Sequence, residues 1–437
     1  MLKTRHYLKP EALVPRYRGD LPEPELARRM ERALDAFTLL EPFGVARPAS
    51  LALIPTADGE IRRLLFTIPQ YAVLDPVMSA AYKRLFATLP ATARLVVLVQ
   101  ASAEAEVTQW LVDAGRDATA EVGAFDDTLN ISIWAEDGYV VAKDGASGRT
   151  YFVEPYAFPR YADGLVADFV SNFTDLRNTQ TPLYFQGGNV LIGDDFLLIG
   201  ADYPANTLEY IRSGVLRPPD GTSPQDFVRM LYSDYLDKGR RLHYVGSRAP
   251  VPQEQSRPIR VNGEPWTEII AAGNRPGTVQ PLFHIDMFIT LIGRASAGTP
   301  YRVMVGDPSR AFSILGGQAP AHAMQRVFDD IATQLGLAGF DVMRNPLPLV
   351  YMDDEMRRER FWYFATSNNA LVQNAPTKHV WLPTYGHGNW PELQATDQAN
   401  ARIWTDLGFE VHALGDFHAF AENLGAVHCI KKYLERG

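Results

Sequence analysis

The sequence predicts an α/β protein. Short apolar runs recur along the 437 residues, often in pairs, and a single amphipathic helix tends to follow a pair. The composition, 46% hydrophobic and 21% charged, is that of an ordinary globular protein with a large core. Strands that alternate with helices imply the α/β class. No sharp sequence repeat is visible, so periodicity alone leaves open a doubly wound sheet and a closed ring of small α/β units.

The N-terminal half supplies the first elements. Apolar residues at helical spacing predict a helix over 24–41, and the run RLVVLV predicts a strand over 94–99 with a helix over 103–113 after it. Two apolar runs within 189–199 flank Gly193-Asp194-Asp195, which predicts a hairpin. Further strands are expected over 51–54, 131–134, 139–142 and 151–154, and a further helix over 204–213.

The segment 215–262 differs in character. A predicted helix over 224–238 lies between loops rich in proline and arginine, such as 247–260, and the whole segment is interpreted as an insertion. Beyond it the alternation resumes. Helices are expected over 321–335 and 393–407, and strands over 266–271, 283–292, 302–305, 340–343, 349–352, 370–373, 380–383 and 409–413.

Charge and cysteine content exclude several classes. The net charge of −9 and pI near 5.6 argue against a nucleic-acid binder and suit either a cationic substrate or simple solubility. One cysteine permits no internal disulfide and no cysteine-rich zinc site. No apolar run reaches the roughly 18 residues that a membrane helix requires, and the N-terminus has no secretory pattern. We therefore expect a cytoplasmic protein without a membrane partner.

Two segments carry glycines or acids where strands are expected. Trp134-Ala135-Glu136-Asp137 places two carboxylates at a strand end, where the commonest explanation is a solvated turn. Gln186-Gly187-Gly188-Asn189 precedes a strand, and the double glycine indicates either a tight turn or close approach of the backbone to another group.

Two further segments carry potential reacting groups. His284 and Asp286 lie two residues apart in an apolar run, so on a strand they would share one face, where burial without a partner is costly. Cys429 follows His428 in Gly425-Ala426-Val427-His428-Cys429, and a lone cysteine is most often an inert apolar residue. The remaining histidines show no ligand spacing, and no phosphate-binding, dinucleotide-binding, zinc-protease or serine-hydrolase motif is present.

Taken together and in this order, the four segments resemble the agmatine deiminase and bacterial-type peptidyl-arginine deiminase family of the guanidino-group-modifying superfamily. The likeness is best over 365–386 (ATSNNALVQNAPTKHVWLPTYG) and the ending His428-Cys429, and it extends over roughly 125–435. It implies a five-bladed, pseudo-symmetric α/β propeller (the pentein fold), here one closed catalytic domain over 1–437 with the insertion at 215–262.

The resemblance assigns roles residue by residue. Cys429 matches the nucleophile and His284 the general acid/base, while Asp137 and Asp286 match the carboxylates that bind the guanidinium. The implied reaction is hydrolysis of a guanidino group to a ureido product and ammonia through a cysteine thiouronium, with no metal or organic cofactor. The implied substrate-side residues are Trp134, Gln186, Gly187, Gly188, Asn189 and, with Asn368 adjacent to it, Asn369.

These residue types suit the chemistry. A planar guanidinium presents forked N–H donors that match carboxylate oxygens, and a thiolate is activated by a nearby cation. A histidine can protonate departing ammonia and then deprotonate water. Two positions depart from the family: Glu136 stands where relatives carry arginine, and Gln186 where they carry glutamate, which bears on agmatine as the substrate.

Several alternatives stay open. The substrate is a small guanidino compound or a peptide arginine, and arginines between the second and third segments favour a substrate with a carboxylate or peptide carbonyl over agmatine. An amidinotransferase would pass the amidino group to an amine, and an inactive member would only bind guanidinium. A metal hydrolase that uses His284 and Asp286 ranks last. The oligomeric state, including a homo-oligomer, is not indicated. The arginines in question are Arg212, Arg217, Arg240, Arg241, Arg248, Arg257 and Arg260.

Overall fold

The computed structural model describes residues 48, 50–156, 158–160, 162–212 and 217–437. The helix expected over 24–41 lies outside the described residues. The chain forms two compact units, each described here by itself. Unit 1 comprises the chain up to Leu74, then Leu89–Tyr244 and Cys429–Gly437, and unit 2 comprises Asp75–Thr88 and Val245–His428.

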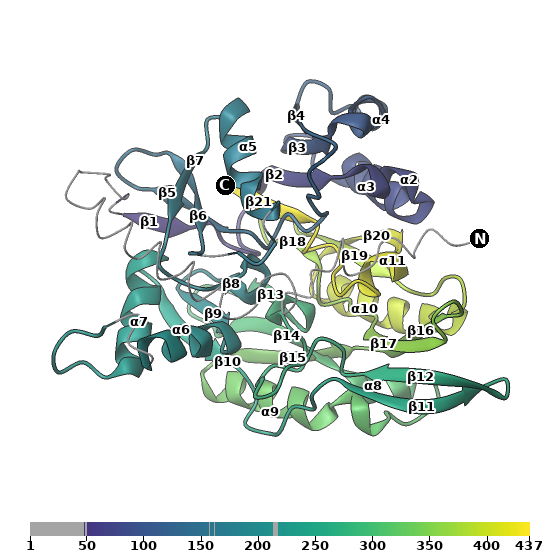
Figure 1. Ribbon diagram of the computed structural model, residues 1–437. Coiled ribbons are helices and arrows are strands. Elements are labelled where there is room, and N and C mark those ends of the chain that lie inside the picture. Colours follow the sequence, from purple (N-terminus) through teal and green to yellow (C-terminus); the bar gives the residue numbers. More distant parts are fainter. Residues whose placement is uncertain (1–47, 49, 157, 161, 213–216) are drawn as a thin grey trace. The chain divides into compact units, whose positions relative to one another are not determined.

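One three-stranded module recurs in the described chain (Figure 1). Its first two strands pair antiparallel, and a helical connection then leads to a third strand that pairs parallel with the second. A parallel pair needs such a crossover, because the chain must return to the same end of the sheet. The sequence predicted pairs of strands followed by a helix, and this module has that order. The α/β prediction is therefore confirmed.

Unit 1 contains three sheets. Its first module pairs β5 (Val140–Asp144), β6 (Thr150–Glu154) and β7 (Arg177–Gln180) across α5 (Val166–Phe173), with β1 (Leu51–Leu53) added at the edge. The second orders β8 (Val190–Ile192), β9 (Phe196–Gly200) and β10 (Arg241–Val245), joined through α6 (Asp202–Arg212) and α7 (Pro224–Tyr235). The third holds β2 (Ile61–Ile68), β3 (Arg94–Gln100), β4 (Ala120–Phe125) and β21 (Lys431–Arg436).

The third sheet joins the two ends of the described chain. β21, the last strand, pairs antiparallel with β2, which pairs parallel with β3 across α2 (Gln70–Leu74) and α3 (Pro76–Thr88). Beyond the strands, Glu60 and Gly437 exchange two backbone hydrogen bonds of 3.1 and 2.9 Å. α4 (Glu104–Asp113) connects β3 to β4. The segment that begins at Cys429 is therefore tied into unit 1 by a full strand.

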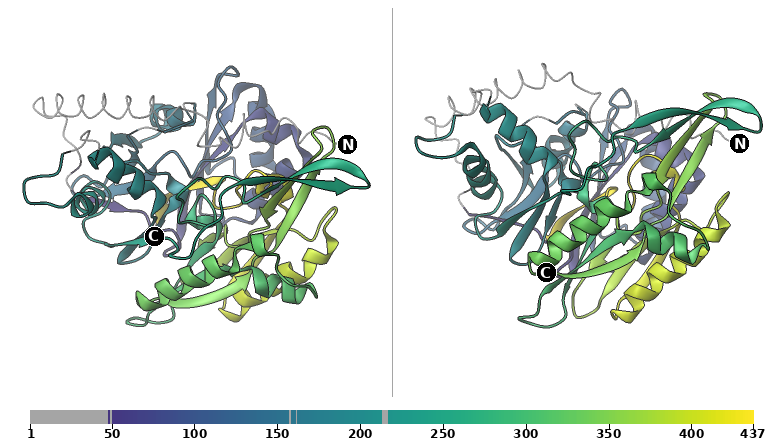
Figure 2. Two further views of the ribbon diagram at one scale, coloured as in Figure 1. Left: turned by 60° about the horizontal axis from the view of Figure 1, so that its bottom comes forward. Right: turned by 90° about the horizontal axis from the view of Figure 1, so that it is seen from below.

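Unit 2 contains two modules and one further sheet. The modules are β13 (Ile289–Arg294), β14 (Tyr301–Asp307) and β15 (Asp341–Pro346), with α8 (Pro308–Ile314) and α9 (Gln325–Leu337), and β18 (Leu371–Gln373), β19 (His379–Thr384) and β20 (Glu410–Asp416), with α10 (Gln394–Asp406). α9 packs along β14 and β15, as the two views in Figure 2 show. A short α11 (His418–Ala421) follows β20.

The further sheet of unit 2 orders β11 (Gln255–Val261), β12 (Glu264–Ile270), β17 (Glu359–Phe364) and β16 (Leu349–Asp354). The β11–β12 hairpin turns at Asn262-Gly263, both with positive φ, a pairing typical of tight hairpins. β11 corrects the prediction of a loop over 247–260, which Pro258 had suggested; proline is tolerated here because β11 is an edge strand.

The expected insertion at 215–262 contains parts of two sheets, since β10 completes a module of unit 1 and β11 belongs to unit 2. α7 is not peripheral either: Val228, Tyr232 and Leu236 are buried in one apolar cluster with residues of β8 and β9. The insertion as a unit of its own stays a prediction. Among the described residues, none of the helices is both long enough and apolar enough to cross a membrane.

Candidate active site

The four residues proposed to react are divided between the units. Asp137 and Cys429 belong to unit 1, and His284 and Asp286 to unit 2. The chain passes from unit 2 to unit 1 at the His428–Cys429 peptide bond. All four are buried, with exposed fractions of 3% or less.

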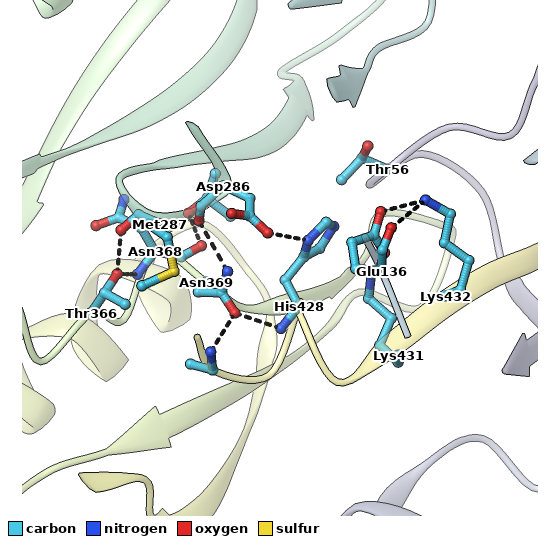
Figure 3. Close-up of polar contacts among 12 residues, drawn as sticks. Thr56, Glu136, Asp286, Met287, Thr366, Asn368, Asn369, His428, Lys431 and Lys432 are labelled. Atoms are coloured by element: carbon cyan, nitrogen blue, oxygen red, sulfur yellow. Dashed lines mark hydrogen bonds and ion pairs between the residues drawn. The ribbon is translucent and has the colours of Figure 1, made fainter. Parts of the chain in front are cut away.

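In unit 2, Asp286 forms a buried pair with His428 (Figure 3). Asp286 Oδ2 and His428 Nδ1 lie 2.9 Å apart, and the two side chains are 2% and 4% exposed. An ionised carboxylate only accepts, so His428 Nδ1 carries the proton of this bond. Burial of a carboxylate in apolar surroundings is costly unless it is paired, and His428 supplies that partner directly before the cysteine.

Asn369 holds the segment that leads to Cys429. Its Oδ1 accepts hydrogen bonds from the backbone N–H groups of Ala426 (3.0 Å) and His428 (2.9 Å). Its Nδ2 donates to the backbone carbonyl of Asp286 at 3.4 Å. Asn369 thus connects the Asp286 turn to the 426–428 segment, as Figure 3 shows. These contacts make it a positioning residue.

The neighbouring asparagine has a different role. Asn368 Nδ2 donates to Asn345 Oδ1 at 2.9 Å, and the Asn368 carbonyl accepts from Thr290 Oγ1 at 2.6 Å. These partners lie on β15 and β13, away in sequence from His428. Of the two adjacent asparagines, Asn369 is therefore the one beside the Asp286–His428 pair.

The segment around His284 is not the strand that was predicted over 283–292. His284 is extended, but a 3₁₀ turn occupies Ile285–Met287 before β13 begins at Ile289. The expectation that His284 and Asp286 share one strand face is therefore wrong. The turn is pinned by Thr366 Oγ1, which donates to the Met287 carbonyl at 2.6 Å. The His284 ring packs against that of Phe283, with centroids 4.0 Å apart.

In unit 1, Asp137 is engaged by an internal guanidinium. Arg160 Nη2 donates to Asp137 Oδ2 at 2.6 Å, and Arg160 Nε lies 2.9 Å from Asp163 Oδ2. Asp163 in turn accepts from the backbone and hydroxyl of Ser132, both at 2.6 Å. All three charged side chains are 9% exposed or less. Asp137, predicted to bind the guanidinium of a substrate, here pairs with the guanidinium of Arg160, and its role toward a substrate stays a prediction.

The position before Asp137 is also held by buried charges. Glu136 Oε2 lies 2.8 Å from Lys431 Nζ, and Glu136 Oε1 lies 2.7 Å from Lys432 Nζ (Figure 3). Burial lowers the pKa of Lys432, and the negative charge of Glu136 opposes that shift. The Glu136 N–H donates to the Cys429 carbonyl at 3.1 Å. The 134–138 loop and the cysteine backbone are therefore joined directly.

Gly187 is required by close packing against this loop. Its N–H donates to the Asp137 carbonyl at 2.8 Å. A Cβ at Gly187 would lie 1.9 Å from the Glu136 carbonyl oxygen and 2.6 Å from that of Tyr139. Gly187–Asn189 forms a 3₁₀ turn, and Asn189 Nδ2 donates to the Gly200 carbonyl at 3.2 Å. Gln186, Gly188 and Trp134 are buried in the same unit.

Solved structures share this architecture. The agmatine deiminase of Enterococcus faecalis aligns with 13% identity and a TM-score of 0.57, and that of C. jejuni with 12% and 0.54. A third structure, a structural-genomics target with the same proposed activity, aligns with 14% and 0.57. Each alignment covers 89% of this chain and 96% of the other. The chain has the fold of the agmatine deiminases.

Sequence comparison alone finds less. No protein-family profile matches the chain, and no curated protein matches it by sequence. Within the agmatine deiminase fold, three contacts escaped prediction because their partners are distant in sequence: Asp137 with Arg160, Glu136 with Lys431 and Lys432, and Asp286 with His428. The adjacent lysines Lys431 and Lys432, two and three residues after Cys429, were a signal in the sequence for the second of these.

Proposed function

We propose that this chain is a hydrolase of guanidino groups that uses Cys429 as its nucleophile. The observation that carries the proposal is that a chain with the agmatine deiminase fold has its only cysteine buried directly after His428, whose ring is paired with Asp286. The resemblance of Asp137, His284 and Asp286 to the family's reacting residues supports it further. The general class, a hydrolase of C–N bonds in linear amidines, follows from the same neighbours.

The reaction proceeds in two balanced steps. The Cys429 thiolate attacks the guanidinium carbon and forms a C–S bond, and the C–N bond to one terminal nitrogen breaks. His284 gives its proton to that nitrogen, which leaves as ammonia, and a cationic thiouronium remains on Cys429. His284 then takes a proton from water, and the resulting hydroxide attacks the same carbon. The C–S bond breaks to release the thiolate, and the hydroxyl proton is lost to solvent as the C=O bond of the ureido product forms.

Asp137 and Asp286 have the role of guanidinium acceptors in this proposal. Arg160 is one partner of Asp137 and His428 is one partner of Asp286, and an ionised carboxylate can accept up to about four hydrogen bonds. Arg160 would hold the Asp137 carboxylate ionised and oriented toward a second guanidinium. His428, held at its backbone by Asn369, would do the same for Asp286.

Two residues, Glu136 and Gln186, differ from the family pattern, and the structure shows contacts that account for Glu136. Glu136 stands where the family carries arginine, and its one carboxylate pairs with both buried lysines, which stabilises unit 1. We infer that this difference from the family does not disturb the reacting residues, because the Glu136 charge is paired with Lys431 and Lys432. Gln186 in place of glutamate removes one negative charge from the predicted surroundings of the histidine.

We also propose that the recurring modules form a closed five-bladed propeller. In five sheets of the described chain, an antiparallel pair is followed by a helical connection to a third strand beside its second strand. In one of them the first strand is β21, the last strand described, which pairs with β2. A ring of repeated units can close when a strand from the late part of the sequence completes a blade from the early part, as β21 does beside β2.

The substrate preference rests on fewer arginines than the sequence suggested. Five of the seven candidates interact with nearby groups of their own unit: Arg212 with Glu209, Arg240 with Asp237, Arg241 with Asp195, Arg257 with Glu268, and Arg260 with the Gly263 carbonyl. Among the described residues, the side chains of Arg217 and Arg248 have no such partner, so we choose these two as candidates for a substrate carboxylate. Arg217→Ala and Arg248→Ala should lower kcat/KM for arginine but not for agmatine, while Arg212→Ala should change neither.

A ureido colour assay tests the proposed activity. Purified protein is incubated with agmatine, arginine and a peptide with C-terminal arginine, and Cys429→Ala is the control, with its circular dichroism spectrum confirming an intact fold. The expected result is ureido product and ammonia from at least one compound, and none from the alanine variant. Amidino transfer to an added amine would favour the amidinotransferase, and binding without product from any compound would indicate an inactive member.

A further inference from the structure

Two histidines and a glutamate of unit 2 converge on neighbouring strands. His379 begins β19, and Glu410 and His412 lie on β20. The strands are parallel, with His379 opposite Glu410 and Trp381 opposite His412. Because residues i and i+2 of a strand share a face, the three side chains project from one face of the sheet. The two histidines are 33 positions apart in the sequence, which explains why spacing gave no sign of the cluster.

The distances among their ligand atoms are those of a metal site. His379 Nδ1 and His412 Nε2 lie 3.1 Å apart. Glu410 Oε2 lies 3.5 Å from His379 Nδ1, and Glu410 Oε1 lies 3.7 Å from His412 Nε2. Zn–N and Zn–O bonds of about 2.0–2.2 Å in a tetrahedron place ligand atoms about 3.3–3.5 Å apart. The three separations bracket that range.

We propose that His379, Glu410 and His412 bind a divalent transition-metal ion of the Zn²⁺ class. Two imidazoles and one carboxylate are a known zinc donor set, and they leave the fourth position for water. The ion would bridge β19 and β20, so its expected effect is on stability. The proposal is independent of the guanidino chemistry, because none of the three residues has a role in that reaction.

The surroundings hold the two rings in place. The Trp381 ring packs nearly parallel to that of His412, with centroids 5.0 Å apart and planes at 17°. Trp381 Nε1 donates to Thr88 Oγ1 at 3.1 Å, which fixes the indole. Glu410 is 66% exposed, which leaves a route for an ion from solvent.

A simple hydrogen bond between neutral rings is the competing explanation for the 3.1 Å contact. It differs from a metal site in what it predicts. A hydrogen bond needs only the two rings, and Glu410 would contribute little because it is exposed. A metal site needs all three ligands, so the carboxylate exchange Glu410→Gln should weaken zinc binding while leaving the fold intact.

The experiment is zinc titration of metal-free full-length protein against a chromophoric chelator. Cys429→Ser serves as the background, so that the active-site thiol does not contribute. One equivalent of Zn²⁺ should bind, and His379→Ala, His412→Ala and Glu410→Gln should each weaken binding by about 100-fold or more, at or above the effect of losing an outer partner. His387→Ala, another partly buried histidine of unit 2, is the matched control and should bind as the background does.

Two further readings decide the outcome. Co²⁺ in place of Zn²⁺ should give the visible absorption of a tetrahedral ion, which Glu410→Gln should lose. Zn²⁺ should also raise the Tm of the background protein but not that of Glu410→Gln. Zinc binding equal in Glu410→Gln, His412→Ala and the His387→Ala control, or no stoichiometric binding at all, would overturn the proposal.

Discussion

The buried charges of unit 1 give the sharpest stability prediction. Replacing Glu136 with glutamine keeps the shape of the side chain but removes the charge that faces Lys431 and Lys432 at 2.8 and 2.7 Å. The three side chains are 5%, 0% and 4% exposed, so water cannot take the place of the carboxylate. Removal of one partner from a buried ion pair costs about 3–5 kcal/mol, because the remaining charge stays buried and uncompensated.

We therefore expect Glu136→Gln to lower the free energy of unfolding by about 3–5 kcal/mol. Urea denaturation followed by tryptophan fluorescence measures it. The matched control is Glu264→Gln, which breaks the pair with Arg358 at 3.2 Å, where both side chains are more than half exposed. That change should cost at most about 1 kcal/mol.

The pH dependence of the stability lost in Glu136→Gln is a second test of the buried-charge argument. Burial lowers the pKa of Lys432 below its unfolded value, so the unfolded state binds more protons and stability rises with pH through that range. Loss of Glu136 lowers this pKa further. The deficit of Glu136→Gln should therefore shrink as pH rises toward the unfolded lysine pKa of about 10.4. A loss below about 1 kcal/mol at pH 7, equal to the exposed control, would refute the buried-charge argument.

Three further predictions follow. Gly187→Ala should destabilise the protein by more than about 3 kcal/mol because its Cβ would meet backbone oxygens, whereas Gly336→Ala, in the open on α9, should gain about 0.5–1 kcal/mol; urea denaturation checks both. Asp137→Asn and Asp286→Asn should each lower kcat/KM about 10²–10³-fold, and near-normal steady-state kinetics would exclude that residue as a guanidinium acceptor. Burial raises the pKa of Glu154 from 4.5 to about 8, so the folded state holds the extra proton and stability falls as pH rises between these values; Tm of Glu154→Gln measured from pH 5 to 8 should fall less than that of the wild type.

The sequence predicted the regular elements where one local signal dominated. The strands over 94–99 and 380–383 and the helix over 393–407 appear as β3, β19 and α10 within a few residues. Apolar periodicity depends on neighbours in the chain, so it can be recognised without knowing the fold. The hairpin over 189–199 is confirmed for the same reason, as β8 and β9 with its turn at the predicted glycine.

Other elements carried mixed signals. β11 contains Pro258 and two arginines, so its sequence does not show the alternation of apolar and polar residues that predicts a strand. It forms a strand by pairing with β12. The apolar run 283–292 predicted one strand, but Ile285–Met287 forms a 3₁₀ turn, and Thr366 donates a hydrogen bond to the Met287 carbonyl. A side chain about 80 residues away thus decides the local conformation, which periodicity cannot anticipate.

In the candidate site, too, some features were predictable from the sequence and others were not. Its residue types were predicted through resemblance, but their partners were not, because Arg160, Lys432 and His428 come from separate segments. Asn369 was expected beside the substrate, which stays a prediction, and its contacts with the backbone of the 426–428 segment were not expected. Positioning residues of this kind have no composition or spacing signal, since they contact backbone groups.

The central claim is that Cys429 forms a covalent bond to the guanidino carbon of the substrate. Its most direct test is the intact mass of the enzyme, quenched with acid within one turnover of a substrate that gives ureido product. A deiminase should gain the mass of the whole substrate less one ammonia, on the peptide that contains Cys429, and Cys429→Ala should gain nothing. A gain of the amidino group alone would show that the amine, not ammonia, is the first leaving group. Turnover that persists in Cys429→Ala, with no adduct on the wild-type enzyme, would contradict the account.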